Sequence, residues 1–239
     1  MAIWNTLLKG ASTVPVPSLL VHFVVAAVAI AIYRKQLAEV VAVWHANSPR
    51  VGRPAISAEP FQHFMRDCIK RYNYNTLASL ATILSITVYL TIEEAKAQAE
   101  KHVLLQALAV LSLTYLVNGL ILSMIFMDSL THICGYYPGT LIWMEKQAAA
   151  PGDAWLSMPV VLSTPFTFTA CGIITFVVFR AACAAISVLD LEDLAYRLTD
   201  AEEHYIAIGV VVYMVVMVIQ TVLTAKAMLR TKTHRITVT

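Results

Sequence analysis

The residues of this chain best suited to chemistry are its seven histidines, since histidine is a common metal or haem ligand and a proton relay near neutral pH. His22, His102 and His204 each lie within or beside a long apolar stretch. If these stretches cross a membrane in alternating directions, the three histidines lie near its outer side. A shared depth would suit a metal, haem or quinone site. Only His22 is clearly inside a stretch, however, so we predict no resident metal and no cofactor, and retain these three as the candidates.

Asp128 and His132 are a second candidate pair, because residues four apart lie on one face of a helix. The pair could act as metal ligands or as a proton relay. It also lies at the boundary of an apolar stretch, where a solvated ion pair is an ordinary feature. The sequence leaves both interpretations open.

Four further residues could line a polar path through a membrane. Ser79 and Thr82 share a hydroxyl-bearing stripe, and Asn118 lies near the middle of another apolar stretch. Pro165 lacks a backbone donor and predicts a helix kink, a feature also found at transport sites. The alternative is helix packing, since small and hydroxylated residues allow close approach and hydrogen bonds between helices.

Several other kinds of chemistry find no support in the sequence. It contains no Gly-rich phosphate loop, no H-E-x-x-H and no G-x-S-x-G. Its four cysteines form no C-x-x-C, which favours small apolar core residues over zinc or disulfide roles. The net charge is +2 without a basic block interleaved with aromatics, so we expect no nucleic-acid partner.

The elements that must position these residues are membrane helices. The chain is 59% hydrophobic and 13% charged, and its charges leave five uncharged windows of more than 18 residues, each long enough to cross a bilayer as a helix. We therefore predict an all-α fold, a single integral-membrane domain over residues 1–239 that bundles five transmembrane helices. Its spans are expected at about 16–33, 75–92, 103–127, 157–179 and 204–225.

Basic residues orient this bundle. With five spans, 12 Lys and Arg residues fall on one side and 4 on the other, namely Lys9, Lys96, Lys101 and Arg197. Because Lys and Arg accumulate in cytoplasmic loops, the amino terminus is expected outside and the carboxyl terminus on the cytoplasmic or matrix side. Acidic residues show the opposite bias, so the inner face carries +6 and the outer face −5.

Two connections are predicted to be helical. Residues 34–72 read as an inner amphipathic hairpin, with apolar positions at helical spacing on both sides of a break rich in Pro and Gly. Such a hairpin can lie in the interface or stand off the membrane. Residues 187–198 read as a short outer surface helix with an acidic back.

One segment resembles a known family. Arg71 followed by the small-residue run at 75–84 is similar to the uncharacterised plant and bacterial integral-membrane proteins known only as a domain of unknown function. The resemblance covers residues 19–185. The chain departs from the family by lacking an aromatic-rich basic segment before the second span and by adding a fifth span. It implies a membrane protein without a known reaction, so it transfers no catalytic residues.

These observations favour a non-catalytic membrane component, an accessory or scaffolding subunit of a larger membrane complex that contacts lipids and other membrane-protein subunits. The sequence has no paired carboxylates inside the spans and no nucleophile constellation. A small-solute or ion transporter or channel is the alternative, with the polar path described above. A redox membrane protein using the outer histidines is the second alternative.

Overall fold

The computed structural model describes residues 15–47, 59–92, 103–134, 158–188 and 200–233. Every element in these ranges is a long α-helix, so the prediction of an all-α bundle is confirmed for the described residues. The helices are α2 (Pro15–Asn47), α3 (Glu59–Leu90), α5 (Val103–Cys134), α7 (Met158–Val188) and α8 (Asp200–Thr233).

Four of these helices are long and apolar enough to cross a membrane: Pro17–Val43, Val103–Ile133, Met158–Ile186 and Glu203–Leu229. They are compatible with a multi-pass integral-membrane protein. α3 is long enough but is not apolar enough to be counted with these four helices. Its first half carries five charged residues, and its second half is interrupted by Asn, Thr and Ser side chains, which lower its apolar character.

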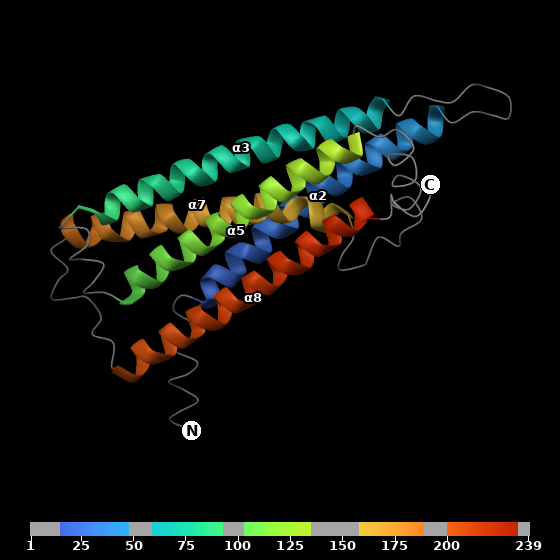
Figure 1. Ribbon diagram of the computed structural model, residues 1–239. Coiled ribbons are helices and arrows are strands. Elements are labelled where there is room, and N and C mark those ends of the chain that lie inside the picture. Colours follow the sequence, from blue (N-terminus) through green and yellow to red (C-terminus); the bar gives the residue numbers. More distant parts are fainter. Residues whose placement is uncertain (1–14, 48–58, 93–102, 135–157, 189–199, 234–239) are drawn as a thin grey trace.

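The five helices lie side by side along a common direction and alternate in sense, as Figure 1 shows. α5 occupies the centre, packing against α7, α3 and α8, while α2 packs mainly on α7. Half of the apolar window of α5 is buried, against 17% of that of α2. The interior of the bundle is therefore built around α5.

α5 and α7 approach closely because glycine occupies both sides of their contact. A Cβ on Gly119 would come within 2.7 Å of Thr169 Oγ1, and a Cβ on Gly172 within 2.6 Å of Leu116 Cγ. The Ser112 hydroxyl donates to the Gly172 carbonyl at 2.8 Å. Small residues at a helix interface are the usual way in which membrane helices approach, since apolar burial does not drive association in lipid.

The outer surface of the bundle is apolar rather than polar. On α8 a broad face of large aliphatic side chains is about half exposed, and it includes Val211, Val215, Val218 and Val222 with values from 49% to 58%. A continuous apolar surface of this kind is stable against lipid and marks a membrane or interaction face in a protein. The polar side chains buried in the interior are, in contrast, mostly the hydroxyl-bearing Ser and Thr.

The predicted inner connection is formed by extensions of two helices. α2 runs without interruption past residue 34 to Asn47, and α3 begins at Glu59 and continues into the apolar segment from Asn75. The end of α2 extends past the other helices in Figure 1, whereas the first turns of α3 pack into the core of the bundle. Phe61 and Met65 of α3 are buried in the same cluster as Leu130 of α5 and Met158 of α7. Of the predicted outer helix, residues 187 and 188 belong to α7 and residues 189–199 lie outside the described part.

Candidate functional site

Asn118, a buried polar residue near the middle of α5, makes two hydrogen bonds. Its amide nitrogen donates to the Thr114 carbonyl at 2.7 Å, and its amide oxygen accepts from Thr221 Oγ1 of α8 at 2.8 Å. The single proton of the Thr221 hydroxyl is shared with the Met217 carbonyl of its own helix, at 2.9 Å. The amide of Asn118 therefore joins α5 to α8.

Ser79 and Thr82 behave differently although they share a stripe. Ser79 is fully buried, and its hydroxyl lies 3.1 Å from Thr169 Oγ1 of α7, beside Gly119. Thr82 donates to the Ala78 carbonyl of its own helix at 2.8 Å. The contact of Ser79 lies between α3 and α7, whereas that of Asn118 lies between α5 and α8, so these residues serve separate helix contacts.

Pro165 lies inside α7 and is buried, with hydroxyl groups around it. Thr164 Oγ1 donates to the Val160 carbonyl at 2.8 Å. One turn before the proline, the Leu162 carbonyl accepts a hydrogen bond of 2.8 Å from the Tyr72 hydroxyl of α3. Hydroxyl donors of this kind satisfy backbone acceptors around a helix-interior proline. Pro165 is therefore compatible with a role in helix packing as well as with a polar pathway.

The three candidate histidines have different environments. His22 is 8% exposed, and its ring stacks on Tyr115 with centroids 5.8 Å apart. Its Nδ1 atom has no hydrogen-bond partner. His204 is exposed near the start of α8, and His102 lies outside the described residues. Within the described ranges, no three His, Cys, Asp or Glu side chains gather as metal ligands would.

An aromatic cluster around His22 was not predicted from the sequence. Tyr115 on α5 and Tyr213 on α8 hydrogen-bond through their hydroxyls, and Phe168 of α7 lies 5.7 Å from the His22 ring centroid. The cluster joins α2, α5, α7 and α8 near the middle of the bundle. A tyrosine within an apolar stretch was the available signal, because a buried hydroxyl requires a partner.

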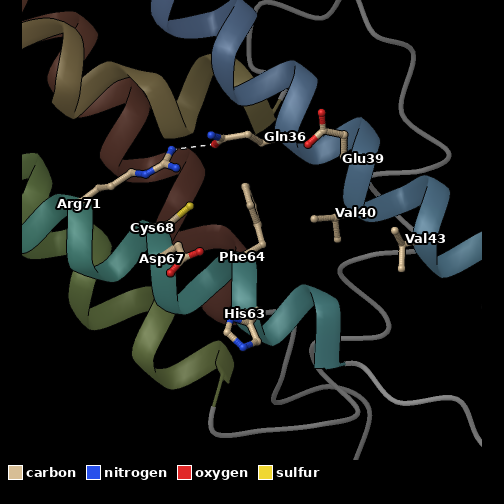
Figure 2. A pocket seen from close by; sticks show the side chains of 9 residues that line it. All are labelled: Gln36, Glu39, Val40, Val43, His63, Phe64, Asp67, Cys68 and Arg71. Carbon is tan, nitrogen blue, oxygen red and sulfur yellow. Dashed lines mark hydrogen bonds between the residues drawn. The ribbon is translucent and has the colours of Figure 1, made fainter.

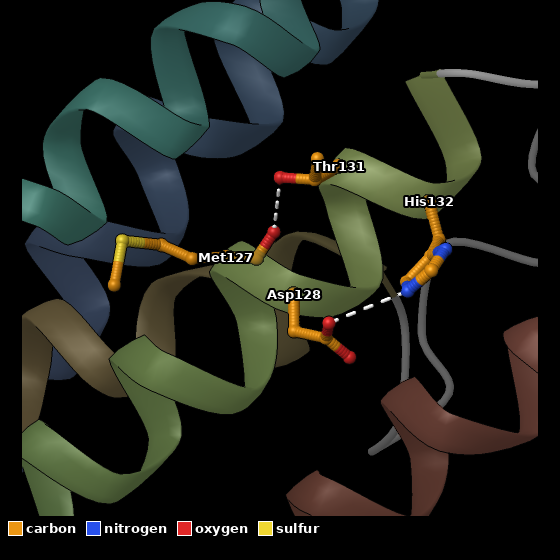
Figure 3. Close-up of polar contacts among 4 residues, drawn as sticks. All are labelled: Met127, Asp128, Thr131 and His132. Atoms are coloured by element: carbon orange, nitrogen blue, oxygen red, sulfur yellow. Dashed lines mark hydrogen bonds and ion pairs between the residues drawn. The ribbon is translucent and has the colours of Figure 1, made fainter.

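Asp128 and His132 are brought together near the end of α5 (Figure 3). Asp128 Oδ1 lies 3.4 Å from His132 Nε2, and both side chains are more than half exposed. Thr131, between them, donates to the Met127 carbonyl of the same helix at 2.7 Å. An exposed pair at this spacing stabilises a helix by a few tenths of a kcal/mol, about 0.2–0.5. The geometry is that of an exposed contact between side chains on one face of a helix.

A groove of about 290 Å³ opens between the two arms of the hairpin (Figure 2). Its apolar part is formed by Val40, Val43 and Phe64, and polar side chains surround them. At one end the guanidinium of Arg71 donates to Gln36 Oε1 at 2.7 Å, which ties α3 to α2. The full lining comprises Gln36, Glu39, Val40, Val43, His63, Phe64, Asp67, Cys68 and Arg71.

Beside the groove, the hairpin is held together by an aromatic and basic contact. The Arg71 guanidinium lies 5.7 Å from the ring centroid of Tyr33, at a distance suited to a cation–π interaction. Tyr72 is fully buried, and this burial raises its pKa well above the usual value near 10. The hydroxyl of Tyr72 therefore remains a neutral donor at physiological pH.

The chain matches no family model, and comparisons with curated proteins and with solved structures found no similar protein. The resemblance of residues 19–185 to the membrane family of unknown function stays a prediction.

Proposed function

We propose that this chain is a five-span integral-membrane protein that serves as a non-catalytic accessory or scaffolding subunit of a larger membrane complex. The observation that carries the proposal is the open groove between the last turns of α2 and the first turns of α3, at one end of the bundle. An apolar floor with a polar rim is the usual composition of a protein interaction surface.

In this proposal the second half of α3 crosses the membrane in addition to the four helices that are apolar enough to do so. Its exposed side chains form an aliphatic stripe at helical spacing, which suits contact with lipid. In addition, α3 alternates in direction with its neighbours along the length of the bundle. The stripe comprises Leu77, Leu80, Leu84 and Val88, which are 48% to 64% exposed.

The same topology sets the orientation. A crossing by α3 places the hairpin and the carboxyl terminus on the side that holds 12 of the Lys and Arg residues, which is the cytoplasmic or matrix side. The amino terminus then lies outside. A chain in which α3 did not cross would divide the basic residues between the two sides without this bias.

The proposal of a non-catalytic role draws support from the interior polar groups. The amide of Asn118 and the hydroxyls of Ser79 and Tyr72 are engaged in contacts between helices. Groups used in this way stabilise a bundle, by about 0.6 kcal/mol each on average. They are not free to bind a substrate without breaking those contacts.

The test is purification in mild detergent followed by native mass spectrometry. We expect the wild-type protein to purify in an assembly heavier than one 26.3 kDa chain. The Val43→Glu variant should lose the other subunits, because Val43 lines the groove. Ala42→Glu is the matched control, since Ala42 is exposed next to Val43 and does not line the groove. A monomer from wild-type membranes, or equal loss from both variants, would contradict the scaffold.

A small-solute or ion transporter is the second candidate, and one observation favours it. Four buried polar atoms among the described residues have no hydrogen-bond partner, on α2, α3 and α5. Unsatisfied groups of this kind can mark a water or ion position. They are His22 Nδ1, Asn75 Nδ2, Ser123 Oγ and Ser129 Oγ.

Flux in liposomes separates the two functions. Wild-type protein is reconstituted beside Asn118→Leu, and potassium and proton fluxes are recorded. A transporter predicts flux from the wild type that the substitution reduces. The same background signal from both proteins would argue against transport and leave the scaffold as the better account.

A further inference from the structure

Two helices bring their basic residues to one level at the base of the hairpin. Arg71 of α3 donates to Gln36 of α2 at 2.7 Å and lies over the ring of Tyr33 at 5.7 Å. These contacts fix α3 near residue 71 beside α2 at residues 33–36. The cations next to these positions in sequence, on both helices, therefore share a level along the bundle axis.

The neighbouring cations are directed to solvent. Lys35 is 79% exposed and Lys70 is 72% exposed at the side chain, and Arg34 is also exposed. Arg71 is partly buried by its contacts with α2. We name Arg34, Lys35, Lys70 and Arg71 the basic collar.

Acidic residues lie beyond the basic collar, one helical turn farther from the apolar part of each helix. Glu39 follows Lys35 on α2 at 4.0 Å, and Asp67 precedes Lys70 on α3 at 3.8 Å. Both pairs are exposed, so screening leaves them weak. An anion arriving from the apolar side of the collar meets cations first, whereas one arriving through the groove meets Glu39 and Asp67.

The surface on the other side of the basic collar is apolar. Val28 and Ile32 on α2 are 56% and 45% exposed, and Leu77 on α3 is 57% exposed. Tyr74, also exposed, lies between this surface and the collar, where interfacial aromatics are enriched. Residues 17–33 of α2 span about 25 Å of a hydrocarbon core of about 30 Å, so the collar falls at the headgroups.

We infer that the basic collar binds the phosphate of an anionic phospholipid in the inner leaflet, whose acyl chains lie along the exposed aliphatic side chains of α2 and α3. Guanidinium and ammonium groups are the standard partners of phosphate, and Arg presents several donors to it. The order of apolar surface, aromatic and then cations matches the order of acyl chain, interface and phosphate in a lipid. The inference rests on the proposed crossing of α3.

The test uses the full chain reconstituted in nanodiscs of equimolar phosphatidylcholine and phosphatidylglycerol, followed by native mass spectrometry of retained lipid. We expect wild-type protein to retain phosphatidylglycerol preferentially, and Arg34→Gln/Lys35→Gln to lower this preference about tenfold. The charge-matched control is Lys226→Gln/Arg230→Gln on α8, which should keep the preference. Unchanged thermal unfolding in pure phosphatidylcholine shows that each variant is folded.

Three results would overturn the inference. Equal loss from both double variants would show diffuse attraction to the inner face, and equal retention by all proteins would show no role for the basic collar. Displacement of the lipid by equimolar inorganic phosphate would show that phosphate alone is the ligand. The assay needs no partner subunit and a nanodisc exposes both faces, so its failure is distinct from failure of the scaffold.

Discussion

At the scale of single residues, hydroxyl and amide groups inside this bundle connect helices. Asn118 joins α5 to α8, and Ser79 joins α3 to α7. The sequence predicted that these residues lie in apolar stretches, but it could not assign their partners. The partners, Thr221 and Thr169, are more than 85 residues away in the chain, and hydroxyl groups are too common in the spans for spacing to identify them.

The Asn118–Thr221 contact can be measured by a double-mutant cycle. We expect Asn118→Leu and Thr221→Val each to destabilise the protein, with a coupling energy of about 0.6–2 kcal/mol. Thr221→Val leaves the buried amide oxygen of Asn118 without its donor, and Asn118→Leu leaves the Thr221 hydroxyl with the Met217 carbonyl alone. Unfolding in detergent gives the four free energies. Additive losses would contradict a hydrogen bond between these side chains.

Tyr72 gives a prediction that depends on pH. Tyr72→Phe removes the donor to the Leu162 carbonyl and should cost about 1 kcal/mol at neutral pH. Burial raises the pKa of Tyr72 above 10, so the folded protein keeps a proton that the unfolded chain releases. The stability that Tyr72 contributes is therefore complete below pH 10 and is lost as the pH rises above 10, by up to about 1.4 kcal/mol per pH unit.

The measurement is thermal unfolding of both proteins from pH 9 to pH 11. The gap between wild type and Tyr72→Phe should narrow above pH 10. Tyr74→Phe is the control, because Tyr74 is 68% exposed and lies two residues away on the same helix. A gap that stays constant with pH, or a similar response from Tyr74→Phe, would show that the buried Tyr72 hydroxyl is not the group responsible.

At the scale of helices, the contact between α5 and α7 depends on two glycines. Gly119→Val should destabilise the bundle, because its Cβ would meet the Thr169 hydroxyl at 2.7 Å and the Thr169 backbone nitrogen at 3.0 Å. Overpacking of this kind costs about 1–3 kcal/mol. Ala207→Val adds volume at an exposed position of α8 and should have little effect in the same detergent unfolding experiment. Equal stability of both variants would contradict a close α5–α7 contact.

Helix periodicity and uncharged length predicted where the apolar segments lie, because both are local properties of the chain. They did not predict that α3 is one helix from Glu59 to Leu90. The charged first half and the apolar second half suggested two elements, since a segment in water and a segment in a membrane are often separate elements. The backbone hydrogen bonds of a helix form in both environments, so one helix can continue from one into the other. Nothing between Phe61 and Leu90 breaks the helix, which contains no internal proline or glycine.

At the scale of the whole molecule, the central claim is that α3 crosses the membrane and places the hairpin on the basic side. The alternating helices and the exposed aliphatic stripe of α3 support it. The side of the membrane on which the basic collar and the groove lie depends on it, because each is built from the first half of α3 and the second half of α2. A chain with four spans would leave both ends of α3 on one side.

Cysteine accessibility tests this claim most directly. His63→Cys and Ile92→Cys place single thiols at exposed positions toward opposite ends of α3, in a background where the four native cysteines are replaced by alanine. An impermeant maleimide is applied to sealed cells and then to permeabilised cells. The account predicts labelling of Ile92→Cys in sealed cells and of His63→Cys after permeabilisation alone. Labelling of both from the same side would contradict it.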